Sequence, residues 1–301
     1  MWLSQMIKTY AEISIPELPV FKKGKVRDVF DLGNSLLFVA SDRVSAFDWV
    51  LPSLIPDKGK ILTQLSTFWF SFTSSLCPNH VLSADFEKFP SVLQKYRDML
   101  DKRSLLVKKT EVIPVECVVR GYLEGSGWKD YQENGEISGV KLPLGLRQAD
   151  KLSEVIFTPA TKADEGHDIN ISFEEMQKTI GLELSPQIKE LSVSLYKKAS
   201  EYALTRGIII ADTKFEFGLL NGSLVLIDEI FTPDSSRFWP LEDYVPGQSQ
   251  PSLDKQFVRD YLEETSWDKN SPPPELPAEI VTKTSEKYLD IFRRLSGKNE
   301  I

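Results

Sequence analysis

The chain has 301 residues, of which 41% are hydrophobic and 11% aromatic, so it is long enough to bury the cores of two domains. Its formal net charge of -8 argues against a protein that holds nucleic acid by counterion release. The longest apolar runs, such as residues 207–211, are too short to cross a bilayer, and the amino terminus lacks the apolar region of a signal peptide. We therefore expect a cytoplasmic protein with small-molecule partners and with no nucleic-acid or membrane partner.

Cysteine and histidine are scarce. Cys77 and Cys117 are far apart and form no CxxC pair, which predicts buried, reduced thiols rather than a disulfide or a thiolate metal site. His80 and His167 are the only histidines, so a multi-histidine metal centre is excluded.

Sequence patterns in the amino-terminal half predict a β-rich region. Residues 25–30 alternate polar and apolar side chains, 31–34 supply turn residues and 35–40 are apolar, a pattern typical of a β-hairpin. Apolar residues at helical spacing predict an amphipathic helix over 61–75. Residues 104–109 and 115–120 are further strand candidates, and the change in composition after Pro114 places a domain boundary there.

Sequence patterns in the second half predict several helices. Frequent glycine between 121 and 151 favours an irregular region near a site. Ser172 is a predicted cap for a helix over 172–179, and a longer helix over 185–206 should end at Gly207. Residues 247–251 resemble a linker, with helices from about residue 252 and a final helix over 277–295.

Three segments carry cationic side chains that could bind an anionic ligand. Lys23, Gly24, Lys25 and Arg27 lie at the mouth of the first hairpin and could fold over a polyphosphate, although a solvated basic turn gives the same pattern. In residues 41–48, Arg43 stands between two serines and could bind a carboxylate or phosphate; the alternative is an arginine–aspartate network that braces the loop. Residues 120–127 place an arginine at a strand end before a serine in a glycine-rich bend.

The most informative segment is 212–218, with Asp212, Lys214 and Glu216 in alternation, followed by Asn221-Gly222 and then more carboxylates in 228–237. Carboxylates crowded onto one hairpin repel one another unless a cation lies between them, which indicates a Mg²⁺-nucleotide site. An exposed hairpin edge kept soluble by its charges is the alternative.

The turn determines whether two of these carboxylates can share a metal. A plain two-residue turn at Asn221-Gly222 pairs residue 215 with 228 and directs Glu216 and Asp228 to opposite faces. A three-residue loop with Gly222 in the left-handed conformation would put them on one face. We therefore predict a bulged or longer turn, or strands that diverge before Asp228.

Six motifs in order, at residues 24–28, 41–48, 114–121, 125–126, 212–218 and 228–239, resemble the SAICAR synthetase (phosphoribosylaminoimidazole-succinocarboxamide synthase) family. The resemblance covers about residues 20 to 240. The long 122–156 insertion resembles the longer, fungal-type form, and the segment after residue 247 contributes little.

The resemblance implies an α+β, kinase-like two-lobed fold with a small antiparallel β domain over residues 1–114 and a larger α+β domain over 115–301. It implies an ATP- and Mg²⁺-dependent ligase of de novo purine biosynthesis, working as a monomer. The enzyme would join CAIR, a carboxylated aminoimidazole ribonucleotide, to L-aspartate through an acyl phosphate. Its products would be SAICAR, ADP and phosphate.

The family's roles transfer to matching positions of this sequence. The resemblance implies catalytic roles for Lys25, Lys214 and Asp212, and metal ligation by Glu216 and Asp228. The residues implied in nucleotide binding are Lys23, Gly24, Lys25, Arg27, Lys108, Glu116 and Lys162. Those implied in substrate binding are Asp42, Arg43, Ser45, Arg120, Ser126, Lys214, Asp234 and Arg237.

Two other functions remain open at this stage. One is a different ATP-dependent phosphotransferase on a kinase-like fold, although the chain has no His-Arg-Asp or Asp-Phe-Gly motif and is a poor fit to a protein kinase. The other is a catalytically silent nucleotide-binding module. Release of ADP that needs both CAIR and aspartate would distinguish the ligase from both.

Overall fold

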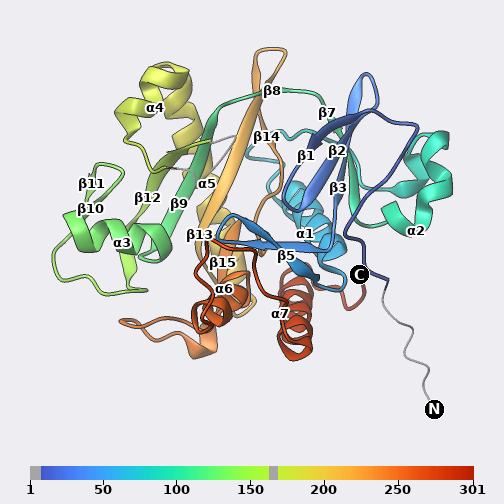
Figure 1. Ribbon diagram of the computed structural model, residues 1–301. Helices are drawn as coiled ribbons and strands as arrows, with labels where there is room; N and C mark the ends of the chain where they lie inside the picture. Colours follow the sequence, from blue (N-terminus) through green and yellow to red (C-terminus); the bar gives the residue numbers. More distant parts are fainter. Residues whose placement is uncertain (1–7, 163–168) are drawn as a thin grey trace. The chain divides into compact units, whose positions relative to one another are not determined.

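A computed structural model describes residues 8–162 and 169–301 (Figure 1). The chain divides into two compact units by its internal contacts. The first comprises the chain up to Thr67, Val81–Lys109 and Lys255–Ile301, and the second comprises Phe68–His80 and Thr110–Asp254. The C-terminal segment thus groups with the amino-terminal strands.

The first unit is built on a five-stranded antiparallel sheet in the order β1-β2-β3-β7-β6. The predicted hairpin is confirmed, since β2 pairs with β3 from Arg27↔Ala40 to Asp31↔Leu36. Alternating side chains such as Phe30, Leu37 and Val39 are buried in one core. The strands are β1 (Val20–Lys23), β2 (Arg27–Asp31), β3 (Ser35–Ala40), β6 (Val81–Ser83) and β7 (Ser104–Lys108), and the short helix α2 spans Arg97–Leu100.

A separate hairpin of this unit, β4 (Arg43–Ala46) with β5 (Trp49–Leu54), packs against the C-terminal helices α6 (Gln256–Glu263) and α7 (Ala278–Ser296). Their shared core contains Val44, Leu51, Val258 and Leu262. The predicted C-terminal helices are therefore confirmed, and the apolar face of α6 explains their place beside the hairpin. Helix α1 (Lys58–Phe72) confirms the predicted amphipathic helix.

The second unit is built on an antiparallel sheet in the order β12-β9-β13-β14, with β8 and β15 also paired to β13. Helix α5 (Leu184–Thr205) packs against β9, β12 and β13. Its Tyr196 hydroxyl donates to the Ile210 carbonyl oxygen at 2.6 Å. The strands are β8 (Glu111–Val112), β9 (Val115–Tyr122), β12 (Lys151–Thr161), β13 (Ile208–Leu220), β14 (Ser223–Ile227) and β15 (Ser236–Pro240).

The segment expected to be irregular contains regular structure. Helix α3 (Gly125–Asn134) follows β9 directly, and a small hairpin of β10 (Glu136–Ile137) and β11 (Val140–Lys141) comes after it. The glycines favoured a loop, but Gly135 is the left-handed C-cap of α3, with φ 71°. The prediction of an irregular region was therefore wrong for residues 125–134.

The capping prediction for the next helix is confirmed. Helix α4 (Phe173–Ile180) begins after Ser172, whose side chain accepts from the Glu175 amide while Glu175 reaches back to the Ser172 amide. Together the antiparallel sheets and helices confirm the α+β class. Within residues 8–162 and 169–301, no helix is long and apolar enough to span a membrane.

Candidate active site

The register of the central strands gathers charged side chains on one face of the sheet in the second unit. Arg120 of β9 pairs with Asp212 of β13, and Lys214 pairs with Val118. Because side chains alternate between faces, Arg120 and Glu116 share a face with Asp212, Lys214 and Glu216. The opposite face carries apolar residues such as Val119 and Phe215. One face therefore forms the core and the other the candidate site.

At one end of this face, two arginines share one carboxylate. The Asp212 Oδ2 atom accepts from Arg120 Nη1 at 2.9 Å and from Arg237 Nη1 at 2.5 Å. Arg120 is also bonded through Nη2 to the Ser126 hydroxyl at 3.0 Å and through Nε to Thr158 Oγ1 at 3.1 Å. Burial lowers the pKa of Arg120, and the carboxylate of Asp212 opposes that shift. We call Arg120, Ser126, Asp212 and Arg237 the arginine cluster.

The start of α3 lies beside this cluster. Gly125 has φ 61°, and a Cβ there would fall 2.1 Å from Arg237 Nη2, so only glycine allows the guanidinium to approach. Arg237 Nε is buried and has no hydrogen-bond partner among the described residues. A helix amino terminus, a serine hydroxyl and an arginine with an unused buried donor fit a phosphate group.

At the other end of the face, two carboxylates lie near each other. Burial raises the pKa of Glu216, the Asp228 carboxylate raises it further, and Lys162 and Lys214 oppose the shift. Lys162 also donates a hydrogen bond to Glu216. Among the described residues, no group of three or more histidine, cysteine, aspartate or glutamate side chains could hold a metal alone. Two mutually repelling carboxylates fit a divalent cation that takes its other ligands from substrate or water.

The turn between β13 and β14 corrects one expectation and confirms its alternative. Leu220 pairs with Ser223, so Asn221 and Gly222 form a plain two-residue turn, with φ values of 52° and 77°. The predicted bulged or longer turn was wrong because Asn-Gly adopts a tight turn of this kind readily. Pairing stops at Ile227, and Asp228 has the left-handed φ of 64°, so the strands diverge before Asp228 as the alternative required.

Buried aromatic packing holds the segment after Asp228. Phe231, with φ 50°, has its ring centroid 5.0 Å from that of Trp69 and 5.1 Å from that of Phe215. Asp234 follows in a loop where its amide donates to Thr232 Oγ1 at 3.2 Å. Non-glycine residues in left-handed conformations are held by tertiary contacts and concentrate at functional sites. This packing therefore fixes the position of Asp228.

The middle of the face holds a further ion pair. Lys214 Nζ lies 2.6 Å from Glu116 Oε1, and Glu116 is buried. The described cations at positions 120, 162, 214 and 237 therefore each have a carboxylate partner. A ligand with phosphate and metal would exchange these partners rather than bind isolated charges.

In the first unit, the basic turn after β1 is held by the β4–β5 hairpin. Gly24 donates its amide to the Arg27 carbonyl oxygen at 2.8 Å, which closes the turn. Lys25 Nζ lies 2.7 Å from Asp48 Oδ1. Arg43 Nη2 donates to Asp28 Oδ1 at 2.8 Å and to the Gly24 carbonyl oxygen at 3.3 Å. The turn is thus braced from two sides, while Lys25 keeps about half of its side chain exposed, at 49%.

The other predicted residues of this unit differ in exposure. Asp42 is fully buried, and its carboxylate accepts from the amides of Tyr10 at 2.8 Å and Gly59 at 3.0 Å and pairs with Arg103 at 3.0 Å. Ser45 is also buried. Lys23 ends β1 and is exposed, and Lys108 ends β7 opposite Ser35. Asp42 and Arg43 thus make bracing contacts, the alternative that the sequence left open for this loop.

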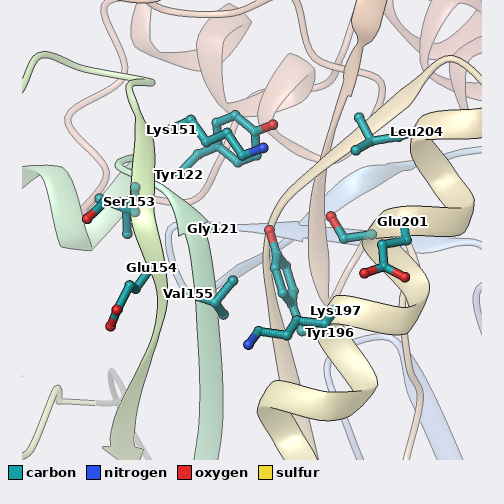
Figure 2. A pocket seen from close by; sticks show the side chains of 12 residues that line it. Gly121, Tyr122, Lys151, Ser153, Glu154, Val155, Tyr196, Lys197, Glu201 and Leu204 are labelled. Carbon is teal, nitrogen blue, oxygen red and sulfur yellow. The ribbon is translucent and has the colours of Figure 1, made fainter.

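A hollow of ≈ 480 Å³ lies on the α5 side of the same sheet (Figure 2). It forms at an irregularity in the pairing of β12 with β9. Lys151 pairs with Tyr122 and Ile156 with Arg120, so β12 has three more residues than β9 over this stretch and bulges outward. Figure 2 shows Lys197 and Glu201 from α5 across from Glu154 of β12. Charges of both signs line this hollow, so it does not select the anionic ligand that the arginine cluster fits.

The thiol prediction is confirmed, and two contributors were missed. Cys77 and Cys117 are buried free cysteines, and burial raises the pKa of Cys77 to about 11. Thr158, which binds Arg120, lies on a strand that the sequence did not predict. Glu124, which caps α3, was hidden by the glycines that follow it. Only the pairing of β12 with β9 brings Thr158 to this face.

Comparisons with known proteins agree with one another. A sequence model of the family described as SAICAR synthetase matches residues 20–274. A relative from Geobacter sulfurreducens named phosphoribosylaminoimidazole-succinocarboxamide synthase is 53% identical over 98% of this chain and 100% of its own length. A relative of the same name from Thermodesulfovibrio yellowstonii is 56% identical over 95% of this chain and 98% of its own.

Solved structures give the same result. The SAICAR synthase from Saccharomyces cerevisiae complexed with SAICAR superimposes with a TM-score of 0.88 at 42% identity, covering 97% of this chain and 98% of that one. A SAICAR synthetase in complex with ADP superimposes with a TM-score of 0.69 at 25% identity, covering 93% and 99%. The greater similarity to the yeast structure agrees with the predicted likeness to the fungal form.

Proposed function

This chain belongs to the SAICAR synthetase family of purine-biosynthesis ligases, and from that premise we propose that it forms an amide between the CAIR carboxylate and the amine of L-aspartate, with ATP and Mg²⁺. The observation that carries the proposal is the arginine cluster at the start of α3. Arg120, Ser126 and Arg237 would hold the phosphate and ribose end of CAIR. The complex of the yeast relative with SAICAR supports binding of a ligand of this kind by this chain.

Glu216 and Asp228 would hold Mg²⁺, because their mutual repulsion is relieved by a cation. The ion, when bound, supplies positive charge against the phosphates of the nucleotide. Lys25 and Arg27 would contact phosphates of the nucleotide, with Lys23, Gly24 and Lys108 close to them. Glu116 and Lys162 are proposed to face the nucleotide as well. The ADP complex of a relative supports nucleotide binding.

The carboxylate needs activation, because direct amide formation would expel oxide. Transfer of the terminal phosphoryl group of ATP to a carboxylate oxygen of CAIR gives an acyl phosphate and ADP. The aspartate amine then attacks the acyl carbon, and phosphate leaves with that oxygen. Lys214 would stabilise the negative charge that accumulates at the carboxylate in both steps, and Asp212 and Asp234 would help to orient the imidazole.

The β4–β5 hairpin would help to hold CAIR or aspartate through Arg43 and Ser45, with Asp42 anchoring it from the core. We propose further that the enzyme acts as a monomer in the cytoplasm.

Omission of substrates tests the proposal. ADP release is measured with ATP and Mg²⁺ and with CAIR and aspartate added singly or together. The ligase releases ADP at its full rate only with both. Release with one acceptor alone would indicate a phosphotransferase, and no release in any mixture would indicate a silent binding module.

A further inference from the structure

The turn of the β4–β5 hairpin has an unusual backbone for its sequence. Ala46 pairs with Trp49, so Phe47 and Asp48 form a two-residue turn, with φ values of 50° and 66°. Turns with two positive φ values favour Asn-Gly, and a bulky residue such as phenylalanine is strained there. Contacts from elsewhere must therefore hold this turn in place.

Those contacts come from residues 265–271, the loop that follows α6. Trp49 Nε1 donates to the Lys269 carbonyl oxygen at 3.0 Å. The Lys269 ammonium lies 4.3 Å from the centroid of the Phe47 ring. The Trp267 ring meets Phe47 edge-on at a centroid distance of 6.0 Å. Three separate contacts thus converge on Phe47 and Trp49, the two residues that flank Asp48.

The 265–271 loop is held together by its own hydrogen bonds. The Asp268 carboxylate accepts from the amides of Asn270 at 3.0 Å and Ser271 at 2.9 Å, and from the Ser271 hydroxyl at 2.7 Å. Trp267 Nε1 donates to the Ser271 carbonyl oxygen at 2.8 Å. These bonds fix the shape of the surface that the loop presents to the turn.

The hairpin that carries the Phe47-Asp48 turn also contacts the basic turn after β1. Asp48 Oδ1 lies 2.7 Å from Lys25 Nζ, and Arg43 at the base of the same hairpin reaches the Gly24 carbonyl oxygen. We propose that Phe47, Trp267 and Lys269 are positioning residues, which fix Asp48 and through it place the Lys25 ammonium for the phosphoryl group. This inference rests on the proposed role of Lys25 with ATP.

The contact between Lys269 and Phe47 is separate from the core that stabilises this part of the fold. That core contains buried side chains such as Val44, Val258 and Leu262, and Phe47 and Trp267 pack against it, whereas Lys269 does not. The Lys269 side chain is 41% exposed and adds little to that core. Loss of its contact with Phe47 should therefore loosen the turn while the fold persists.

The test uses Trp267→Ala and Lys269→Met in the full chain. The matched control is Lys287→Met, which removes the same kind of contact, at 4.7 Å from the Phe257 ring, between the two C-terminal helices. Amide hydrogen exchange of residues 43–50 should become about three- to tenfold faster in both test variants, and kcat should fall by about the same factor. The control should change neither, and Lys269→Arg should restore both.

A double substitution separates positioning from general stability. If the loop acts through Lys25, adding Trp267→Ala to Lys25→Ala should cause no further loss of kcat, because the group being positioned is already gone. Additive losses, or unchanged exchange and kcat in both test variants, would overturn the inference. Should Trp267→Ala fail to fold, Lys269→Met decides alone.

The two proposals fail in different ways. Wild-type kcat in Lys25→Ala would refute the phosphate role of Lys25, which belongs to the proposed function. An impaired Lys25→Ala beside a fully active Lys269→Met would refute only the positioning role of the loop.

Discussion

Replacing Asp212 by asparagine should show how much its charge stabilises the arginine cluster. The change keeps the size of the side chain but removes the charge that Arg120 and Arg237 share, at 2.9 Å and 2.5 Å. Asp212 and Arg120 have exposed side-chain fractions of only 5% and 3%, so water screens the remaining like charges poorly. Removing one partner of a buried pair costs about 3 kcal/mol or more.

In a domain of this size, that loss lowers the melting temperature by about 6–12 °C. The assay is thermal unfolding in a buffer free of phosphate, repeated with added phosphate. Phosphate should restore part of the loss in Asp212→Asn, because a ligand that binds only the folded state stabilises it and two uncompensated arginines bind an anion better. The control is Glu279→Gln, which removes an exposed ion pair with Lys283 and should leave the melting temperature unchanged. Unchanged stability in Asp212→Asn, or no response to phosphate, would refute this reasoning.

Four further outcomes follow from the site and its turn. Because the pKa of Glu216 is raised in the folded protein, the free energy of unfolding without metal should fall as pH rises above 4.5, the ordinary pKa of a glutamate side chain. Glu216→Gln should remove that fall, measured in EDTA, and should lose Mg²⁺-dependent turnover. Parallel curves of stability against pH for the variant and the wild type would contradict this prediction. Lys25→Ala should lower kcat about a hundredfold with a smaller effect on ATP affinity. Arg237→Lys should raise the KM for CAIR but not for ATP, since lysine lacks the two-pronged geometry; equal changes would indicate a folding role. Gly222→Ala should cost about 1 kcal/mol in an unfolding titration and leave kcat unchanged, because the turn at φ 77° lies at an exposed tip.

The parts of the fold that the sequence predicted are those specified by local chemistry. The Ser172 cap, the 31–34 turn and the helical spacing of 185–206 each depend on neighbouring residues, and each is observed. The segment around α3 was missed because its glycines serve special positions, a close approach at Gly125 and a helix end at Gly135. Glycine in a sequence marks a conformational need without identifying it.

In the candidate site, too, some features follow from the local sequence and others depend on tertiary structure. Its charged residues could be chosen from the sequence, but their grouping depends on long-range register. Pairing of Arg120 with Asp212, and the place of Thr158 beside Arg120, require three strands that are distant in the chain. The role of the 265–271 loop was also out of reach, because cation–aromatic contacts between Lys269 and Phe47 leave no pattern in the sequence. Short-range patterns thus identified candidates, and tertiary pairing assigned their neighbours.

Transfer of the phosphoryl group to the CAIR carboxylate is the central step of the proposed mechanism, and oxygen labelling can detect it. CAIR carrying ¹⁸O in its carboxylate is converted with unlabelled ATP, aspartate and water, and the released phosphate is analysed by mass spectrometry. An acyl phosphate predicts one ¹⁸O atom in each phosphate, because the carboxylate oxygen leaves with the phosphoryl group. Phosphate free of ¹⁸O, formed together with SAICAR, would contradict the proposed mechanism.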